Sequence, residues 1–468
     1  MAAADAPAVK AQDYKGISFW HDSVPEPLTP RPSLAGKIEA DVAIVGAGFT
    51  GLWTAYYLKK LDSSLKVVVV EKEIAGFGAS GRNGGWCSGL FPASWGRMAR
   101  ESTRELAVAT QRALFATVDE VGRVAEEEEI NCHYQKGGTI SLARNEAQLA
   151  KARAAIEESR SWGFGEEDYR LLEQGEARSC LDASGTLAAL YTPNCAAIHP
   201  ARLVRGLADV AERMGVQLYE RSAATTIAQR RVETASGSVE SRFVIRATEG
   251  FTSGLPGESR TLLPIYSLMI ATEPLPDSFF ETVGLRRRET FGDLRYMIIY
   301  GQRTADNRIA FGGRGAPYHF GSKVRPEFDR DPRVHESLRS TLVDMFPALA
   351  DVGVTHSWGG ALGVPRDFFP SVSLDPATGL GWAGGYVGDG VSTSNMAGRT
   401  MAHLITGVDS ELLRLPWVNH GWRRWEREPL RWLGFNAVIR SLGRADETEA
   451  RTGKPSRPAS WLGKLLGR

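Results

Sequence analysis

Three spaced glycines carry the clearest chemical signal in this chain. Gly46, Gly48 and Gly51 form a Gly-x-Gly-x-x-Gly pattern directly after the mostly apolar residues 41–45. Between a strand and a helix, such glycines allow a tight turn, close approach of the backbone to a pyrophosphate, and close packing of the helix on the strand. The helix N-terminus then offers free N–H groups to the phosphates. The pattern therefore predicts a dinucleotide-binding segment.

The elements that must position these glycines are also present. A helical apolar pattern covers 52–61, and a second apolar strand follows at 67–70. That strand ends on Glu71, about 20 residues beyond the last glycine, where a carboxylate can accept hydrogen bonds from ribose hydroxyls. The alternative is a glycine-rich turn in an ordinary α/β sheet. The combination of two strands, a helix and an acid favours dinucleotide binding.

The composition excludes several classes of protein. With 468 residues, of which 43% are hydrophobic, the chain is too long for one compact core, so we expect two or more domains. A net charge of +1 gives no reason to expect nucleic acid as a partner. The four cysteines form no Cys-x-x-Cys pair, so neither a metal site nor a disulfide framework is expected. The N-terminus lacks a secretory signal and no apolar run approaches the ~20 residues of a membrane span, so the expected location is the cytoplasm.

The order of patterns along the chain predicts a dinucleotide-binding domain assembled from separated segments. A helical pattern begins at Pro200 and ends at Gly215, and short strands follow at 217–220 and 242–247. A glycine-rich strand and turn precede another helix within 379–405. We therefore expect the following division: dinucleotide-domain segments 36–100, 191–262 and 356–410, an inserted second domain from 101–190 and 263–355, and a basic helical tail over 411–468.

Both ends of the chain are expected to lie outside these domains. Residues 1–35 are polar and rich in proline, which predicts an arm over the protein surface. In the tail, Trp422, Trp425 and Trp432 alternate with arginines, a pattern that suits a membrane-surface helix. The same pattern suits docking onto the body of the protein or onto a partner subunit, which is the interpretation we favour.

The segment 46–89 resembles the D-amino-acid oxidase superfamily of FAD oxidoreductases. Within it, the run Gly76–Gly85 is similar to the gamma-glutamylputrescine oxidoreductase branch of that superfamily. Later stretches agree with the resemblance, which covers about residues 18–410: Ile198–Pro200, Ala247–Gly250, Leu262–Leu275 and Gly384–Val391.

The resemblance implies an α/β and α+β fold, with a Rossmann-like FAD domain of glutathione-reductase type in three segments and an inserted mixed-sheet substrate domain. It implies oxidation of an amine or amino acid, in which hydride leaves the carbon next to nitrogen for flavin N5 and water hydrolyses the resulting imine. Electrons would pass to oxygen or another acceptor, because the chain shows no second dinucleotide unit. Two alternatives stay open: a 2-hydroxy acid or polyol dehydrogenase using a quinone-type acceptor, and a flavin-binding subunit that needs a partner protein.

The residues expected to contact the cofactor follow from the motifs and the resemblance. A second Gly-x-Gly-x-x-Gly pattern begins at Gly76, but we expect no strand immediately before it and no matching helix after it, so it is interpreted as a loop along the flavin ring. Relatives that bind flavin covalently use a Cys or His, which the segments 360–369 and 80–85 lack, so we expect non-covalent FAD; Cys87 nearby is the exception considered. The candidate FAD contacts are Gly46, Ala47, Gly48, Thr50, Gly51, Glu71, Lys72, Gly78, Ala79, Ser80, Arg82, Asn83, Gly84, Gly85, Ala224, Ala247, Thr248, Gly359, Gly388, Gly390 and Val391.

Four residues are candidates for the chemistry itself. Arg82 is expected near the flavin or its phosphates, with a loop-stabilising hydrogen bond as the alternative. Tyr300 and Arg314 lie in the inserted domain, and an arginine suits bidentate binding of a carboxylate. Asp389 stands where many relatives carry His; it could pair with a cationic amine, or it could cap the following helix.

Two histidines complete the candidates. His199 directly precedes Pro200, and a turn or capping role is favoured over catalysis. His356, with Trp358, precedes Gly359, and the resemblance places this segment in the neighbourhood of the flavin.

Overall fold

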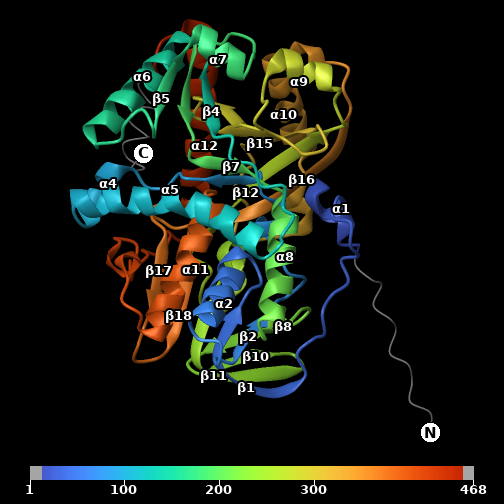
Figure 1. The fold of residues 1–468 in the computed structure, drawn as a ribbon, viewed down its shortest axis with the longest axis vertical. Helices are drawn as coiled ribbons and strands as arrows, with labels where there is room; N and C mark the ends of the chain where they lie inside the picture. Colours follow the sequence, from blue (N-terminus) through green and yellow to red (C-terminus); the bar gives the residue numbers. More distant parts are fainter. Residues whose placement is uncertain (1–12, 457–468) are drawn as a thin grey trace.

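The computed structural model describes residues 13–456. Two mixed sheets of eight strands form the two ends of the molecule (Figure 1), and a short third sheet pairs β3 (Trp86–Ser88) with β7 (Cys195–Ala197). This is the Rossmann-like domain plus mixed-sheet domain that the sequence predicts.

The first sheet is built around the predicted dinucleotide unit. Its central strands run in the order β18–β11–β1–β2–β8 and are all parallel, with β17 antiparallel at one edge. Off this path, β10 pairs with β11, and β9 pairs with β10. Valines bury both faces of β2, as parallel sheets covered on two sides require. The strands are β1 (Gly36–Val45), β2 (Val67–Val70), β8 (Gln217–Tyr219), β9 (Ala224–Ala228), β10 (Arg231–Thr234), β11 (Gly237–Arg246), β17 (Ser371–Leu374) and β18 (Leu380–Gly384).

The second sheet has the order β16–β12–β15–β14–β13–β4–β6–β5 and is antiparallel except between β13 and β4. The predicted boundary between residues 355 and 356 falls inside β16, which belongs wholly to this sheet, so the division into segments stays a prediction. The strands are β4 (Thr139–Ala143), β5 (Arg170–Glu173), β6 (Ala188–Thr192), β12 (Leu263–Thr272), β13 (Thr290–Asp293), β14 (Ile299–Arg303), β15 (Ile309–Arg314) and β16 (Val354–Val364).

Helices cover both sheets, and two of them pack unusually closely. A β-carbon on Gly398 of α11 would lie 2.6 Å from the Trp53 Cβ of α2, so glycine is required where these helices meet. The helices are α1 (Phe19–Asp22), α2 (Phe49–Leu61), α3 (Ala79–Arg82), α4 (Trp95–Glu101), α5 (Arg104–Glu127), α6 (Glu146–Ser161), α7 (Gln174–Cys180), α8 (Pro200–Arg213), α9 (Asp277–Val283), α10 (Pro332–Met345), α11 (Gly390–Thr406) and α12 (Leu430–Thr452). Short 3-10 helices are η1 (Lys15–Ile17), η2 (Glu249–Gly254), η3 (Pro326–Asp329), η4 (Pro347–Leu349) and η5 (Glu411–Arg414).

Helix α8 confirms the prediction made from Pro200. Proline occupies the first turn, where its missing N–H costs nothing, and the His199 ring caps the helix by accepting from the Arg202 backbone N–H at 3.2 Å. The capping role predicted for His199 is therefore correct.

The N-terminal arm is only partly a surface feature. Its described portion runs from β1 at one end of the molecule to α1 beside β16 (Figure 1). Phe19 and Trp20 are buried there in a cluster with Met269 and Trp358. The expectation of a purely superficial arm is wrong for these residues, because their aromatic side chains bury more apolar surface than the surrounding polar chain can offset.

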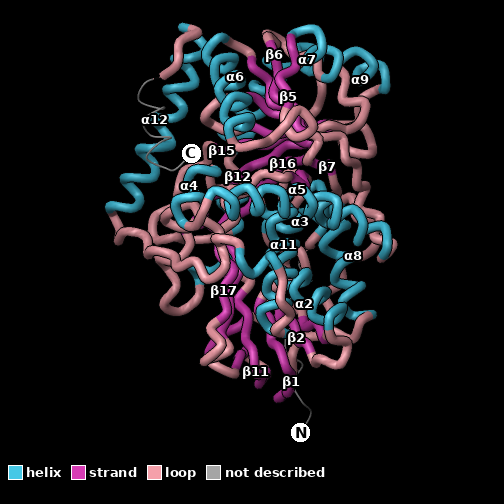
Figure 2. The backbone as a smooth tube through the Cα atoms, turned by 60° about the vertical axis from the view of Figure 1, so that its left-hand side comes forward, coloured by secondary structure: helices cyan, strands magenta, loops and turns pink. Residues whose placement is uncertain are grey.

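The C-terminal tail docks onto the body of the protein, as the favoured interpretation predicts. Figure 2 shows α12 running along the outside of the domain that holds the second sheet. The Asp446 carboxylate accepts from the backbone N–H groups of Tyr296 and Met297 at 2.7 Å each, and the Trp425 indole donates to the Val364 carbonyl at 2.8 Å. Within residues 13–456, no helix combines the length and apolar character needed to cross a membrane. The terminal Trp461–Leu466 segment lies outside the described residues.

Candidate functional site

A cavity of about 640 Å³ lies at the carboxyl ends of the central strands of the first sheet. Its wall includes Val45 at the end of β1, Val70 at the end of β2 and Ala247 directly after β11. Ligands of open α/β sheets bind at this edge, and the volume is typical of cofactor sites. Loop residues 321–325, from the second domain, close part of the opposite wall.

The first glycine motif shapes this cavity through backbone contacts that leave no room for a side chain. Gly46 has a φ of +109°, and a β-carbon there would lie 2.5 Å from the Ala247 carbonyl oxygen. A β-carbon on Gly51 would lie 2.0 Å from the Gly46 carbonyl oxygen. Gly48 is the N-cap of α2 and supplies no side-chain cap, so the helix N-terminus opens onto the cavity. These are the three properties that pyrophosphate binding requires.

The Glu71 carboxylate stabilises the turn at Gly46–Gly48 through hydrogen bonds to the backbone. It accepts from the Ala47 N–H at 2.8 Å and from the Glu73 N–H at 3.0 Å. Burial raises the pKa of Glu71 to about 6. Each carboxylate oxygen has a second acceptor site, so Glu71, which lines the cavity, can still accept from a ribose hydroxyl.

The structure brings most of the predicted cofactor contacts together on the cavity wall. Among the described residues, those that line it are Gly46, Gly48, Thr50, Glu71, Lys72, Gly78, Ala79, Ser80, Asn83, Ala224, Ala247, Thr248, Gly388, Gly390 and Val391. Those that do not are Ala47, Gly51, Arg82, Gly84, Gly85 and Gly359. The contacts with FAD stay predictions, because the position of a residue on the cavity wall does not by itself show that it contacts the cofactor.

The second glycine pattern itself contains a single helical turn, α3, and the next element is the strand β3, so no helix matching that of the first motif follows it, as expected. Ser80 of α3 accepts from the Phe49 N–H at 2.9 Å, at the N-terminus of α2. The Gly76 N–H donates to the Ala47 carbonyl at 3.0 Å. The two glycine segments are therefore held against each other, and both face the cavity.

Arg82 lies behind this wall. Its guanidinium pairs with Asp329 at 2.7 Å and donates to the Gly359 carbonyl at 3.1 Å. The Arg82 carbonyl accepts from the buried Trp358 indole at 2.9 Å. These contacts tie the α3 segment to β16 and η3, which corresponds to the loop-stabilising alternative considered for this residue.

Tyr300 and Arg314 lie together where the second sheet meets the α11 turn. The Tyr300 hydroxyl is 2.7 Å from Ser267 Oγ, and burial raises the Tyr300 pKa while Ser267 and Arg314 partly oppose that rise. Arg314 donates to the Val387 carbonyl at 2.5 Å, and a β-carbon on Gly388 would lie 2.8 Å from its Nη2. Within residues 13–456, Arg314 makes no ion pair with a carboxylate.

Asp389 occupies the N-cap position of α11, but its side chain makes no capping hydrogen bond, so the capping interpretation is wrong. Burial raises the pKa of the Cys195 thiol to about 12, and the Asp389 carboxylate adds to that rise. The open N-terminus of α11 presents Gly390 and Val391 to the cavity.

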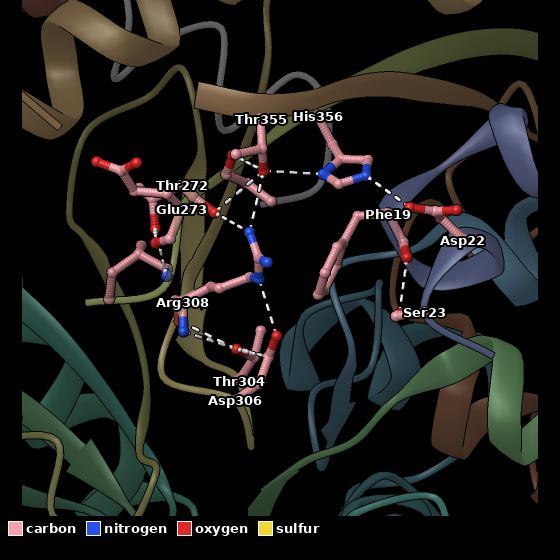
Figure 3. Close-up of polar contacts among 12 residues, drawn as sticks. Phe19, Asp22, Ser23, Thr272, Glu273, Thr304, Asp306, Arg308, Thr355 and His356 are labelled. Atoms are coloured by element: carbon pink, nitrogen blue, oxygen red, sulfur yellow. Dashed lines mark hydrogen bonds and ion pairs between the residues drawn. The ribbon is translucent and has the colours of Figure 1, made fainter. Parts of the chain in front are cut away.

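His356 does not reach this cavity. Its ring bridges Thr355 Oγ1 at 2.9 Å and the Asp22 carboxylate at 3.1 Å, which links β16 to the N-terminal arm (Figure 3). His356 is partly exposed, Trp358 two residues further along the strand is buried, and neither lines the cavity, so the expected place of this segment near the flavin stays a prediction.

Among the described residues of the cavity wall there is neither a cysteine nor a histidine. Cys87, the one thiol considered for a flavin link, is buried in β3, and burial raises its pKa well above the usual value. A protonated thiol is a poor nucleophile. The site therefore suits a cofactor held by non-covalent contacts.

Several parts of the wall were not predicted from the sequence, including residues 253–255, 321–325 and 361–362, and Glu249. Residues 321–325 gave no signal, because nothing local distinguishes them from other basic loops. Glu249 lines the cavity and lies in the stretch Ala247–Gly250, which the resemblance singled out, but it is not among the predicted site residues. Its Oε1 accepts from the Tyr386 N–H at 3.0 Å, whereas its buried Oε2 has no hydrogen-bond partner within residues 13–456.

The Glu249 carboxyl predicts a pH-dependent stability. Burial raises the pKa of Glu249 to about 7, above the ordinary value of 4.5. The neutral carboxyl therefore contributes its full stability to the folded protein below pH 4.5, and this contribution is lost as the pH rises through 7. We expect Glu249→Gln to stabilise the apoprotein at pH 8 by up to about 3 kcal/mol and to change little at pH 4.5. Urea unfolding of the apoprotein at both pH values measures this.

The exposed Glu281 supplies the control, because Glu281→Gln removes a carboxylate without burial. An equal gain from Glu281→Gln, or a loss of stability in Glu249→Gln at pH 8, would contradict the assignment of a strained, buried carboxylate.

Comparison with known proteins supports the same fold and cofactor. The family model described as FAD dependent oxidoreductase (DAO) matches residues 41–404. Gamma-glutamylputrescine oxidoreductase of Escherichia coli (strain K12) is 31% identical over 390 residues, covering 81% of this chain and 86% of that protein. A probable oxidoreductase OrdL of Rhizobium meliloti (strain 1021) is 31% identical over 412 residues, covering 85% of this chain and 90% of that protein.

A solved structure agrees at the level of the fold. The crystal structure of glycine oxidase from Geobacillus kaustophilus superposes with a TM-score of 0.68 at 21% identity, covering 82% of this chain and all of that one.

Proposed function

The chain belongs to the DAO family of FAD-dependent oxidoreductases, and from this premise we propose that it oxidises an amine or amino acid at the carbon next to nitrogen. The cavity supports this cofactor, because the space that β-carbons would fill at Gly46 and Gly51 is taken by backbone and the N-terminus of α2 lines the cavity. The cofactor is FAD, as the family match shows.

We assign the cofactor contacts by chemistry. The turn Gly46–Gly48 and the N-terminus of α2 would hold the pyrophosphate, and Glu71 would accept from the ribose. The N-terminus of α11, with Gly390 and Val391, would face the ring and favour negative charge that develops there. When bound, FAD supplies the oxidising power by accepting hydride from the substrate carbon.

The observation that carries the substrate proposal is Arg314, a guanidinium that lacks a carboxylate partner among residues 13–456 and lies against the α11 turn. An arginine in this position suits a substrate carboxylate, which it can bind through two parallel hydrogen bonds. Tyr300, fixed by Ser267 and packed against Gly84, would form a second wall of the substrate site. The substrate proposed is therefore an amine that carries a carboxylate, bound with its nitrogen neutral when hydride leaves.

Anaerobic reduction of the bound flavin tests the proposal. We expect the visible absorbance band of the oxidised flavin to bleach with at least one carboxylate-bearing amine from a panel that includes gamma-glutamyl amines, N-methyl amino acids and free amino acids, and not with 2-hydroxy acids. Air is then admitted: fast recovery of the band indicates oxygen as acceptor, and slow recovery indicates another acceptor.

The same panel separates the alternatives. Bleaching by hydroxy acids alone would replace the amine proposal with a dehydrogenase of hydroxy acids or polyols. Retention of FAD without bleaching by any compound would favour a subunit that needs a partner protein. The electron acceptor and the cytoplasmic location stay predictions.

A further inference from the structure

A second, smaller cavity of about 130 Å³ lies apart from the cofactor cavity and shares no lining residue with it. Five segments distant in sequence form it: the arm at α1, the loop at His133, the start of α8, the loop at Arg288, and the turn between β14 and β15. Two aromatic rings of the arm, Phe19 and Trp20, form one wall. Nothing in the proposed oxidation uses these residues.

Two guanidinium groups face this cavity. Within residues 13–456, Arg202 makes no side-chain hydrogen bond and no ion pair, and its Nε is buried without a partner. Arg288 donates to the carbonyls of Arg303 at 3.0 Å and His133 at 2.8 Å, which fixes its orientation without neutralising its charge. Burial lowers the pKa of Arg288 to about 10, and the neighbouring Arg303 adds to that effect.

The carboxylate of the cavity wall does not neutralise them. Asp306 accepts from Thr304 Oγ1 at 2.6 Å through one oxygen and from Arg308 Nε at 2.8 Å through the other. Figure 3 shows Asp306 turned toward Arg308, which in turn contacts Thr272 and Thr355. Asp306 therefore pairs with Arg308, and although its charge also acts on Arg288, one carboxylate cannot balance the three guanidinium groups of Arg202, Arg288 and Arg308.

The two histidines of the wall are neutral and add hydrogen-bonding groups. Burial lowers the pKa of His133, and Arg202 and Arg288 lower it further. His199 is committed on both sides, because its Nδ1 accepts from the Arg202 N–H and its Nε2 is 3.0 Å from Ser23 Oγ. His133 is thus the imidazole left to share a proton with a ligand.

The buried Nε of Arg202 lacks a hydrogen-bond partner within residues 13–456, which costs free energy that a bound anion would recover. We propose that this cavity binds a small oxyanion, a phosphate or a short carboxylate, through Arg202 and Arg288. The two groups suit either anion, since both present paired oxygens to a guanidinium. The site is independent of the substrate proposal, because it involves neither Arg314 nor the cofactor wall.

The site also has a direct connection to the cofactor segment. The Trp20 indole donates to the Asn83 carbonyl at 2.8 Å, and Asn83 lines the cofactor cavity. The Ile198 N–H, on the other wall, donates to the Gly85 carbonyl at 2.8 Å. An anion that holds the arm against α8 therefore also stabilises the segment 83–85, whose carbonyls accept these two hydrogen bonds.

Thermal unfolding of the FAD-loaded enzyme, with chloride keeping the ionic strength constant, tests the proposal. Near 100 times its dissociation constant, inorganic phosphate or acetate should raise the Tm by about 3 °C. In Arg202→Gln the anion-dependent rise should disappear, whereas the Tm in chloride alone should stay equal or increase, because an unpartnered charge has been removed. Arg288→Gln should raise the anion concentration needed for the same increase in Tm at least tenfold.

Two controls define the site. Arg286→Gln, at an exposed arginine two residues from Arg288, and Arg314→Gln should both keep the full anion response. A response to phosphate alone or to carboxylates alone supports the site and identifies the class of anion. An unchanged response in Arg202→Gln, loss of the response in Arg314→Gln, or no response of the wild type to any of these anions would overturn the proposal.

Discussion

Gly51→Ala should leave a protein that does not retain FAD. The β-carbon of alanine would lie 2.0 Å from the Gly46 carbonyl oxygen and 3.2 Å from the Ile44 side chain. Backbone oxygen at that distance cannot yield by rotating a side chain, so either α2 moves away from β1 or the Gly46 turn opens. Either movement displaces the helix N-terminus and the turn that would hold the pyrophosphate.

We expect a cost of about 3 kcal/mol, at the upper end of what overpacking usually causes, which corresponds to roughly a hundredfold weaker binding of FAD. The ratio of flavin to protein absorbance after gel filtration measures retention, and titration of the apoprotein with FAD measures affinity. Binding should weaken even where circular dichroism shows a folded protein.

The matched control is Gly434→Ala in α12, where a β-carbon would have nothing within 4 Å. Alanine there should stabilise the helix by about 0.5–1 kcal/mol through propensity and leave FAD binding unchanged. If Gly51→Ala bound FAD as tightly as the wild type, the close packing of α2 on the Gly46 turn would not be what holds the cofactor site.

The sequence predicts this part of the fold well, because its signals are local. Four valines bounded by Lys66 and Glu71 predict a strand at 67–70, and β2 occupies those residues. Pro200 predicts a helix start, and α8 begins there. In both cases a short run of residue types determines the local conformation.

The parts that could not be predicted depend on partners far away in the chain. Trp20 is buried against Trp358, and Arg82 is neutralised by Asp329, which is 247 residues away. Nothing in the polar arm or the glycine-rich loop indicates these partners. The same limit applies to Glu249, whose burial depends on the packing of Gly363 and the Tyr386 backbone around it.

The second large effect concerns Arg314. For the best carboxylate-bearing amine found by anaerobic reduction, Arg314→Gln should lower kcat/KM by about 10²–10³, because loss of one partner from a buried charge pair typically costs 2–5 kcal/mol. Most of the loss should appear in KM, since the carboxylate is distant from the bond that breaks and is bound alike in substrate and transition state. Stopped-flow reduction of the flavin gives both constants.

The position of Arg314 also allows a purely structural role, because it donates to the Val387 carbonyl beside Gly388. Two further measurements distinguish the roles. The matching amine that lacks the carboxylate should react with wild type and Arg314→Gln within about threefold of each other, because neither complex contains the ion pair. Arg314→Lys should recover part of the activity toward the carboxylate-bearing amine, through charge without the bidentate geometry.

An equal loss for both amines, with an altered flavin absorption spectrum, would show that Arg314 acts by holding the Val387–Gly388 turn. That outcome would also remove the argument for a carboxylate on the substrate, because Arg314 is the cation on which it rests. Selective loss for the carboxylate-bearing amine, with unchanged FAD content, would identify the side chain that decides which amines this enzyme accepts.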